Sequence, residues 1–247
     1  MKAALAIFRL FLTSQFTIAR LAISVGLALL GALLAFTISD SQGTVRIEDS
    51  IIFIAIFGVG ILVALTALNL MSGVMGQLRE DQTMVYLWLS PTSRFTMAVA
   101  AVTSGFVAAI PSIIVPLLVI SFIASGSTQL VGYALIAGLA ATIAYCAIFS
   151  FFGLISRFST IIGILFVIVW EGLIVGTLGS GSTGFQRLSI NAQARQILVT
   201  PEGVGSPIAG DLGIAGGGVT SAIVTLAIIT LIGLGLSTWR LQKMEVA

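Results

Sequence analysis

The sequence predicts an all-α integral membrane protein with six transmembrane helices. Of its 247 residues, 58% are hydrophobic and only 8% are charged, whereas a soluble globular domain carries about 25% charged residues. Such a chain cannot cover a water-facing surface with polar side chains. It also contains six apolar runs near the roughly 20 residues that a helix needs to cross the hydrocarbon core. Together they make one transmembrane domain over residues 1–247.

Polar segments separate the predicted spans. No charged residue lies between Arg94 and Arg157, and this stretch is long enough for two crossings joined by a turn at Ser125–Gln129. Arg94 and Arg157 are therefore expected on the same side of the membrane. The spans are Leu21–Ile38, Ile51–Met75, Phe95–Ala124, Leu130–Ile155, Ile161–Leu178 and Val219–Trp239, with an outer loop over Gly179–Gly218.

The basic residues predict the orientation of these spans. With both termini in the cytoplasm, eight of the eleven Lys and Arg residues fall on the cytoplasmic side and three on the outer side, as the positive-inside rule requires. We therefore expect a multi-pass protein of the cell (cytoplasmic) membrane. The cytoplasmic set is Lys2, Arg9, Arg20, Arg79, Arg94, Arg157, Arg240 and Lys243, and the outer set is Arg46, Arg187 and Arg195.

Composition also excludes several functions. Histidine is absent and Cys146 is the only cysteine, so His-based catalysis and Cys-cluster metal sites are excluded. Neither lysine, Lys2 nor Lys243, follows a glycine loop, and a Walker A site needs one. The chain is therefore expected to be no enzyme by itself, with no catalytic residue, metal or cofactor of its own. Its scattered basic residues do not form a nucleic-acid-binding face.

Residues 2–20 are expected to form an amphipathic helix in the membrane plane. On a helical wheel the polar residues fall within a sector of roughly 80°, and a helix of this kind lies at the membrane surface with its polar stripe facing the cytoplasm. The alternative is an ordinary flank at the start of the first span. The polar residues are Lys2, Arg9, Thr13, Thr17 and Arg20.

The segment Gln77–Arg94 concentrates charge in a chain that otherwise avoids it. Glu80 and Asp81 suit the first turn of a short helix, and Pro91 ends or turns that helix. An apolar face follows the acidic pair. Two interpretations are equally open: a helix on the lipid headgroups with Tyr86 and Trp88 as anchors, or a docking element for a cytoplasmic partner.

Glu171 is the most informative intramembrane residue, because a carboxylate at the bilayer centre costs about 2.5–3.5 kcal/mol on insertion scales. Three roles are open: a structural or gating group, a group on a transport or proton pathway, or a peripheral group near the outer face. Asn69 can bond between helices. Pro111 and Pro116 predict a kink in the third span, either a hinge or simple curvature.

Two milder expectations concern Cys146 and the outer loop. Cys146 has no basic neighbour to stabilise a thiolate, so we expect a buried small hydrophobe. In the outer loop, Asn191 is predicted to N-cap a short helix from Ala192 to Val199 that ends at Thr200–Pro201. Arg187 and Arg195 are expected to meet lipid headgroups or a periplasmic partner, or to belong to a cap over an outer gate.

The loop after the second span resembles the cytoplasmic loop of type-2 ABC exporter permeases. The similar features are the pattern Arg79-Glu80, Tyr86-Leu87, Ser90-Pro91 and Ser93-Arg94, the N-terminal in-plane helix, the six spans, the chain length, the long outer loop and Trp170-Glu171-Gly172. The resemblance covers essentially the whole chain. It implies that the short cytoplasmic helix is a coupling helix and that short helices of the outer loop re-enter the outer leaflet.

The resemblance further implies the membrane-spanning half of an ATP-driven exporter. Its partners would be a second permease chain, in a homodimer or heterodimer, and an ATP-binding cassette subunit that holds ATP and Mg. Glu80 would carry the contact with that subunit, within a coupling site of Arg79, Glu80, Asp81, Tyr86 and Trp88. An apolar pathway favours a hydrophobic or amphipathic substrate. The alternative is an ion-gradient-driven secondary transporter or channel with Glu171 as proton carrier, and an intramembrane enzyme is a third class.

Overall fold

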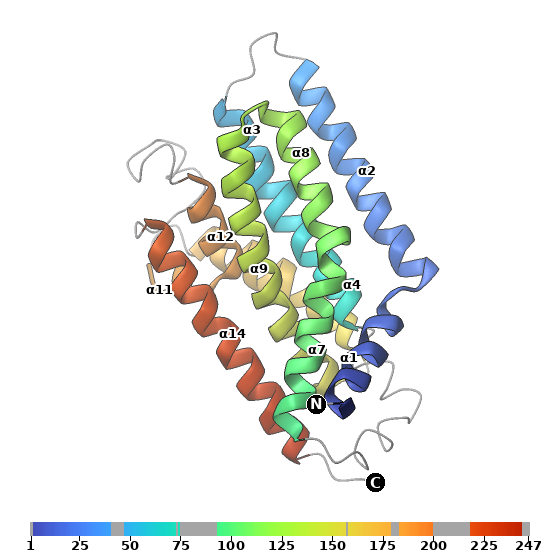
Figure 1. Cartoon of the computed structure of the whole chain (residues 1–247). Helices are drawn as coiled ribbons and strands as arrows, with labels where there is room; N and C mark the ends of the chain where they lie inside the picture. The colour runs from blue at the N-terminus through green and yellow to red at the C-terminus, as the bar shows by residue number, and fades with distance from the viewer. Residues whose placement is uncertain are drawn as a thin grey trace.

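The computed structural model describes residues 2–40, 47–72, 74, 93–156, 158–178, 183–199 and 218–243. In these ranges the chain is almost entirely helical and has no strand (Figure 1). The elements, in which η marks π-helical segments, are α1 (Lys2–Gln15), α2 (Ile18–Asp40), α3 (Ile47–Phe53), η1 (Ile54–Val63), α4 (Ala64–Met71), α7 (Arg94–Ala109), η3 (Ile110–Ile114), α8 (Val115–Ser125), α9 (Thr128–Ile155), α10 (Ser159–Leu165), η4 (Phe166–Leu178), α11 (Thr183–Leu188), α12 (Ile190–Val199) and α14 (Gly218–Lys243).

Five continuous helices in the described chain are long and apolar enough to cross a membrane. They are Ile18–Ser39, Glu48–Met71, Arg94–Ser125, Thr128–Ile155 and Gly218–Lys243. They match the predicted first, second, third, fourth and sixth spans, so the all-α membrane class is confirmed. The fifth predicted span is the continuous run of α10 and η4, of which Ser159–Leu173 is a shorter apolar helix. The sixth crossing and the orientation stay predictions.

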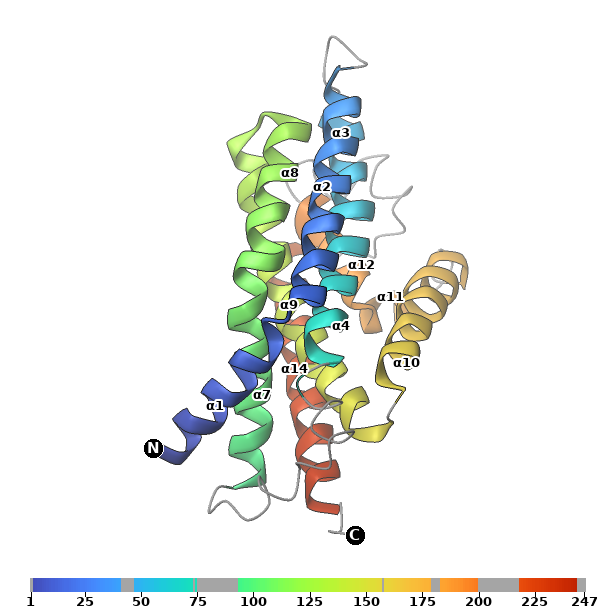
Figure 2. The same cartoon turned by 90° about the vertical axis from the view of Figure 1, so that its right-hand side faces the viewer.

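The N-terminal segment is a separate helix, because the chain breaks helical structure between α1 and α2 at Phe16 and Thr17. Figure 2 shows α1 at an angle to α2. One face of α1 is buried through Phe11 and Gln15, and the Gln15 amide donates to the Ser104 hydroxyl of α7 at 3.1 Å. Arg9 is exposed. The helix is therefore two-faced, but it ends at Gln15, so the predicted helix over residues 2–20 is too long and Arg20 belongs to α2. Its position relative to a bilayer stays a prediction.

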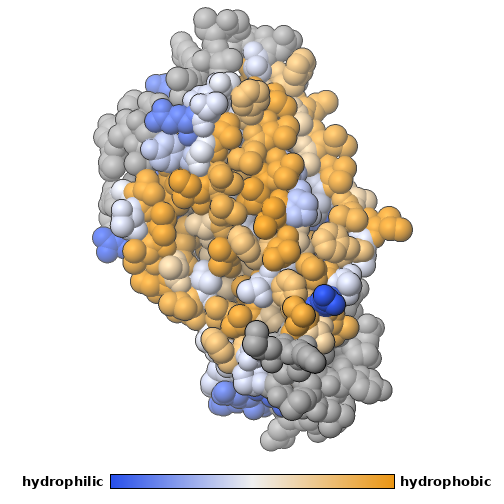
Figure 3. Space-filling model, viewed as in Figure 1, coloured by the Kyte–Doolittle hydropathy of each residue, from blue (hydrophilic) through white to orange (hydrophobic). Residues whose placement is uncertain are grey.

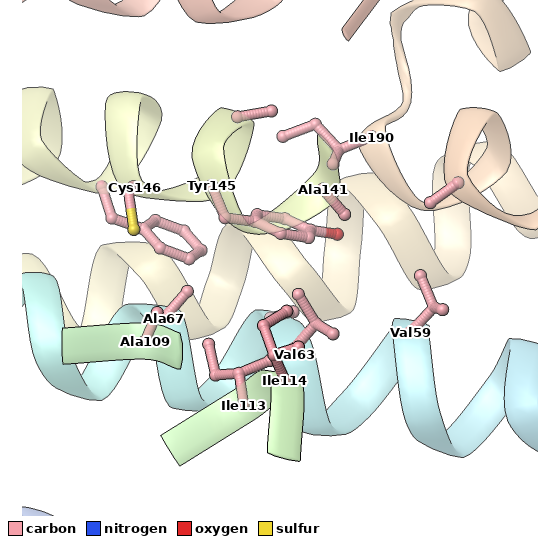
Figure 4. Packing of buried hydrophobic residues seen from close by; sticks show 14 of the residues in the cluster. Val59, Val63, Ala67, Ala109, Ile113, Ile114, Ala141, Tyr145, Cys146 and Ile190 are labelled. Atoms are coloured by element: carbon pink, nitrogen blue, oxygen red, sulfur yellow. The ribbon is translucent and has the colours of Figure 1, made fainter. Parts of the chain in front are cut away.

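The core centres on α9, which packs against α14, α12, α4, α8 and α7. Tyr145, Cys146 and Phe149 of α9 are buried in it (Figure 4), as expected for Cys146. α14 comes closest at Gly233, where an added Cβ would lie 2.9 Å from the Ala147 carbonyl carbon. Lipid tails are as apolar as the side chains, so helices in a membrane gain from such close backbone approach rather than from hydrophobic burial.

The third long helix changes type at its two prolines. The π-helical segment η3 includes Pro111, and Pro116 follows at the start of α8. The amide of Val115 bonds to the carbonyl of Ile110, five residues back. Proline has no amide proton, so each one removes a rung of the α-helical ladder, and a π-helical turn is a common local adjustment inside a helix. The predicted disturbance therefore takes the form of a π-helical segment.

Candidate functional site

The predicted coupling site lies outside the described residues. Arg79, Glu80, Asp81, Tyr86 and Trp88 all fall within residues 75–92, so their proposed roles stay predictions. Among the described residues, the polar groups gather around Glu171 instead.

Glu171 caps the N-terminus of α12. Its side chain is only 5% exposed. The carboxylate accepts hydrogen bonds from the Ser189 hydroxyl, from the Ile190 amide at 3.0 Å and from the Asn191 amide at 3.3 Å. The first amides of a helix have no partner within the helix, and they carry the positive end of its dipole. A carboxylate placed there gains charge-assisted bonds, which compensate part of the cost of burying it.

Ser189 is the N-cap residue of α12, and the prediction for Asn191 is wrong. The Ser189 hydroxyl accepts from the Ala192 amide at 3.0 Å while it donates to Glu171. The helix begins at Ile190, two residues before the predicted start, and extends to Val199. Both Ser and Asn are good N-cap residues, so local sequence could not choose between them. The carboxylate of Glu171, 18 residues earlier, makes the choice.

Asn191 has a different partner. Its Oδ1 accepts from Arg195 Nε at 3.0 Å, one helical turn later. Both side chains lie against Gly60 of η1, where an added Cβ would be 3.2 Å from Asn191 Nδ2 and 3.4 Å from Arg195 Nη2. Arg195 is thus partly buried against η1, whereas Arg187 is exposed, and the contact of either residue with headgroups stays a prediction. Burial lowers the pKa of the Arg195 guanidinium, and the nearby Tyr145 and Glu171 act in the opposite direction.

Tyr145 completes this cluster from α9. It is fully buried, and its hydroxyl finds no hydrogen-bond partner within the described chain. Figure 4 shows its ring among Val63, Ile114 and Ala141, with Ile190 of α12 nearby. Glu171 and Arg195 are the charged groups within electrostatic range of this side chain. A tyrosine hydroxyl in a membrane helix can bond between helices, but that of Tyr145 makes no such bond to the described residues.

Helix α12 links four parts of the bundle. It packs against α9, α14, η1 and η4, and Gln196 donates to the Gly218 carbonyl of α14 at 3.0 Å. Glu171 holds its N-terminal end and Gln196 holds its middle. This arrangement can keep a short helix in a fixed place between longer ones. It provides the contacts that a structural or gating role of Glu171 requires.

The remaining predicted residues lie apart from this cluster. Asn69 Nδ2 donates to the Arg20 carbonyl at 3.1 Å, a bond between α4 and α2. Pro111 and Pro116 lie on the side of the third long helix that faces α2. Ser150 of α9 bonds to Ser237 of α14 at 3.0 Å. The structure therefore separates Glu171 from the other three intramembrane candidates.

Comparison with known proteins adds no family: no family model matches the chain, and no curated protein matches it. The residues themselves carry the functional argument.

Proposed function

We propose that the chain is the membrane-spanning permease subunit of an ATP-driven ABC exporter that moves a hydrophobic or amphipathic substrate. The observation that carries the proposal is α12, a short helix of the outer loop that packs back among the long helices. Short re-entering outer helices are what the resemblance to type-2 permeases implies. The separate N-terminal helix α1 and five long apolar helices are compatible with the same arrangement.

In this proposal, energy comes from a separate subunit. Closure of two ATP-binding cassettes would push on Glu80 and its coupling helix, between α4 and α7 in the chain. Both helices pack against α9, which in turn contacts α12. A rigid-body movement of α4 and α7 would therefore reach the outer helix through packed neighbours. Glu171 would keep α12 attached to η4 during that movement.

The proposed six spans place both termini in the cytoplasm, and a second permease chain completes the pathway. The site residues would then divide by role. Arg79, Glu80, Asp81, Tyr86 and Trp88 couple to the ATP-binding subunit, and Glu171 holds the outer helix.

The test is co-purification from mild detergent followed by transport in vesicles. We expect an ATP-binding subunit to be recovered with the tagged chain, and transport to require ATP. Glu80→Ala is expected to reduce substrate-stimulated ATP hydrolysis at least about tenfold, the loss expected for about 1.4 kcal/mol of coupling. Glu48→Ala is the matched control, because Glu48 is an exposed acidic residue at the other end of the second long helix.

The second candidate is a secondary transporter, favoured by the buried Glu171 with Arg195 and Tyr145 nearby. A carboxylate in such a cluster can exchange a proton with a pathway. Transport driven by a pH gradient without ATP, and lost in Glu171→Gln, would support this candidate. The same result, with no ATP-binding subunit recovered, would overturn the exporter.

A further inference from the structure

A groove of about 370 Å³ runs between α2 and the third long helix. Its α2 wall includes the small side chains Ser24, Ala28 and Ala32, one helical turn apart, beside the larger Leu21, Val25 and Leu29, and its other wall includes Pro111, Ser112 and Pro116. In the view of Figure 1, α2 leans away from α8 towards its N-terminal end. Figure 3 shows that hydrophobic residues cover most of the middle of this face.

The groove is closed at one end by close helix packing. A Cβ on Gly31 of α2 would overlap the Phe57 ring and the Ile120 side chain, so α2 touches its neighbours at this level. The C-terminal ends of α2 and of the third long helix both lie at the top of Figure 1, so the two helices run in the same direction. Ser24 lies about two turns before Gly31 on α2, and Ser112 lies about two turns before Ile120 on the third long helix, since both helices rise about 1.5 Å per residue. Because Gly31 contacts Ile120, Ser112 lies at about the level of Ser24.

The length of the groove matches one lipid tail. From Leu21 to Ala32 the helix rises about 17 Å, which is close to half of the roughly 30 Å hydrocarbon core. A groove of this length covers one leaflet and no more. It lies on exposed transmembrane helices, where lipid tails are the surrounding solvent.

Two serines, Ser24 and Ser112, lie at the open end of the groove among otherwise apolar side chains. Ser112 is only 8% exposed, and its hydroxyl has no hydrogen-bond partner within the described chain. The hydroxyl of Ser24, at the same level, donates a hydrogen bond to the Arg20 carbonyl at 3.0 Å. Pro116 has no backbone N–H group, so it cannot donate a hydrogen bond to the carbonyl one turn before it. An ester group of a lipid can bond with the Ser112 hydroxyl, which a pure hydrocarbon cannot.

Arg20 lies one turn beyond Ser24 at the same end. Its guanidinium is partly buried and donates to the Ser14 carbonyl at 2.6 Å, across the break between α1 and α2 that contains the groove residue Phe16. A guanidinium has five N–H donors, and no carboxylate of the described chain pairs with Arg20. The nearest other charge on α1, Arg9, is also positive.

We propose that this groove binds one anionic phospholipid, with its acyl chain against Ala28 and Ala32, its ester at Ser112 and its phosphate at Arg20. The polar groups, the apolar walls and the length occur in the order that this lipid presents them. The lipid would bridge the break between α1 and α2 and the π-helical segment η3. It is a resident ligand of the fold, so the proposal does not depend on the exporter function.

The test uses the purified full chain, reconstituted in vesicles of equal parts phosphatidylglycerol and phosphatidylcholine with the same acyl chains, then extracted and examined by native mass spectrometry. We expect one retained lipid per chain, with phosphatidylglycerol preferred. Ala28→Phe fills the groove and is expected to lower the retained lipid at least about tenfold, which corresponds to losing the burial of about two methylene groups. Leu33→Phe is the control, because Leu33 is exposed on α2 and does not line the groove.

Two further variants keep the test decisive. Val119→Trp narrows the groove from its exposed rim and is expected to act as Ala28→Phe does, even if that variant fails to fold. Arg20→Gln is expected to reduce the preference for phosphatidylglycerol roughly fivefold, the effect of one cation at an anionic surface, whereas Arg9→Gln leaves it nearly unchanged. Unaltered lipid retention in both groove variants, or equal effects of the two arginines, would overturn the proposal.

Discussion

The two sides of the bundle differ in how their polar and packing requirements are met. On the side of α14 and α12, the backbones come close at Gly233 and the buried carboxylate of Glu171 accepts three hydrogen bonds. On the side of α2, the helices leave a groove lined by Ser112, whose hydroxyl has no partner among the described residues. The first side is completed by the protein itself. The second leaves room for the lipid that surrounds it.

This difference follows from the forces that act between helices in a membrane. Apolar surface alone does not hold two helices together there, since lipid covers the same surface equally well. Close backbone approach and hydrogen bonds decide where helices stay in contact. The Glu171 side contains both, and on the α2 side the described residues show a close approach at Gly31 and a bond from Asn69. We therefore expect substitutions to cost more on the first side.

The largest effect is expected from Glu171→Ala. The change leaves the Ser189 hydroxyl and the Ile190 and Asn191 amides buried without their acceptor, which costs about 3 kcal/mol in the free energy of unfolding. The measurement is SDS-induced unfolding in mixed micelles, together with hydrogen exchange of residues 190–192. Glu171→Gln keeps an acceptor oxygen and is expected to lose about 1 kcal/mol. Equal stability of all three proteins would show that the α12 cap contributes nothing.

A smaller effect is expected where α14 meets α9. Gly233→Ala places a Cβ 2.9 Å from the backbone of Ala147, and the overpacking is expected to cost about 2 kcal/mol. Gly235→Ala is the control on the same helix, because nothing lies within 4 Å of an added Cβ there. We expect this control to match the wild-type protein or exceed it slightly, since alanine favours helix over glycine. A stable Gly233→Ala variant would contradict the tight packing of this side.

The sequence predicted the long helices well because their signal is local. Five apolar runs became the five long helices with shifts of a few residues at their ends, since length and hydropathy determine such a helix without knowledge of its neighbours. The disturbance at Pro111 and Pro116 was predicted for the same reason, whereas the helix expected over residues 2–20 ends at Gln15. Each depends on residues within one or two turns.

The candidate site was predicted only in part, because its contacts join distant segments. Glu171 drew attention as a carboxylate in an apolar run, but nothing near it in the chain pointed to Ser189. Asn191 and Ser189 are equivalent as N-cap residues, and the choice depends on a side chain 18 positions earlier. Arg195 was expected to meet headgroups or a periplasmic partner or to belong to a cap, and no local pattern indicated that its side chain would lie against Gly60. Such outcomes need the packed structure.

The smallest effect is expected from Asn69→Ala on the α2 side. The variant loses one bond to the Arg20 carbonyl, and bonds between membrane helices contribute about 0.6 kcal/mol on average. Ser150→Ala removes a bond of the same kind between α9 and α14 and serves as the comparison. If lipid helps to hold α2, the Asn69→Ala loss should grow in micelles without phosphatidylglycerol, while the Ser150→Ala loss stays the same. If the losses in the free energy of unfolding of both variants changed equally with lipid, the contrast between the two sides would be refuted.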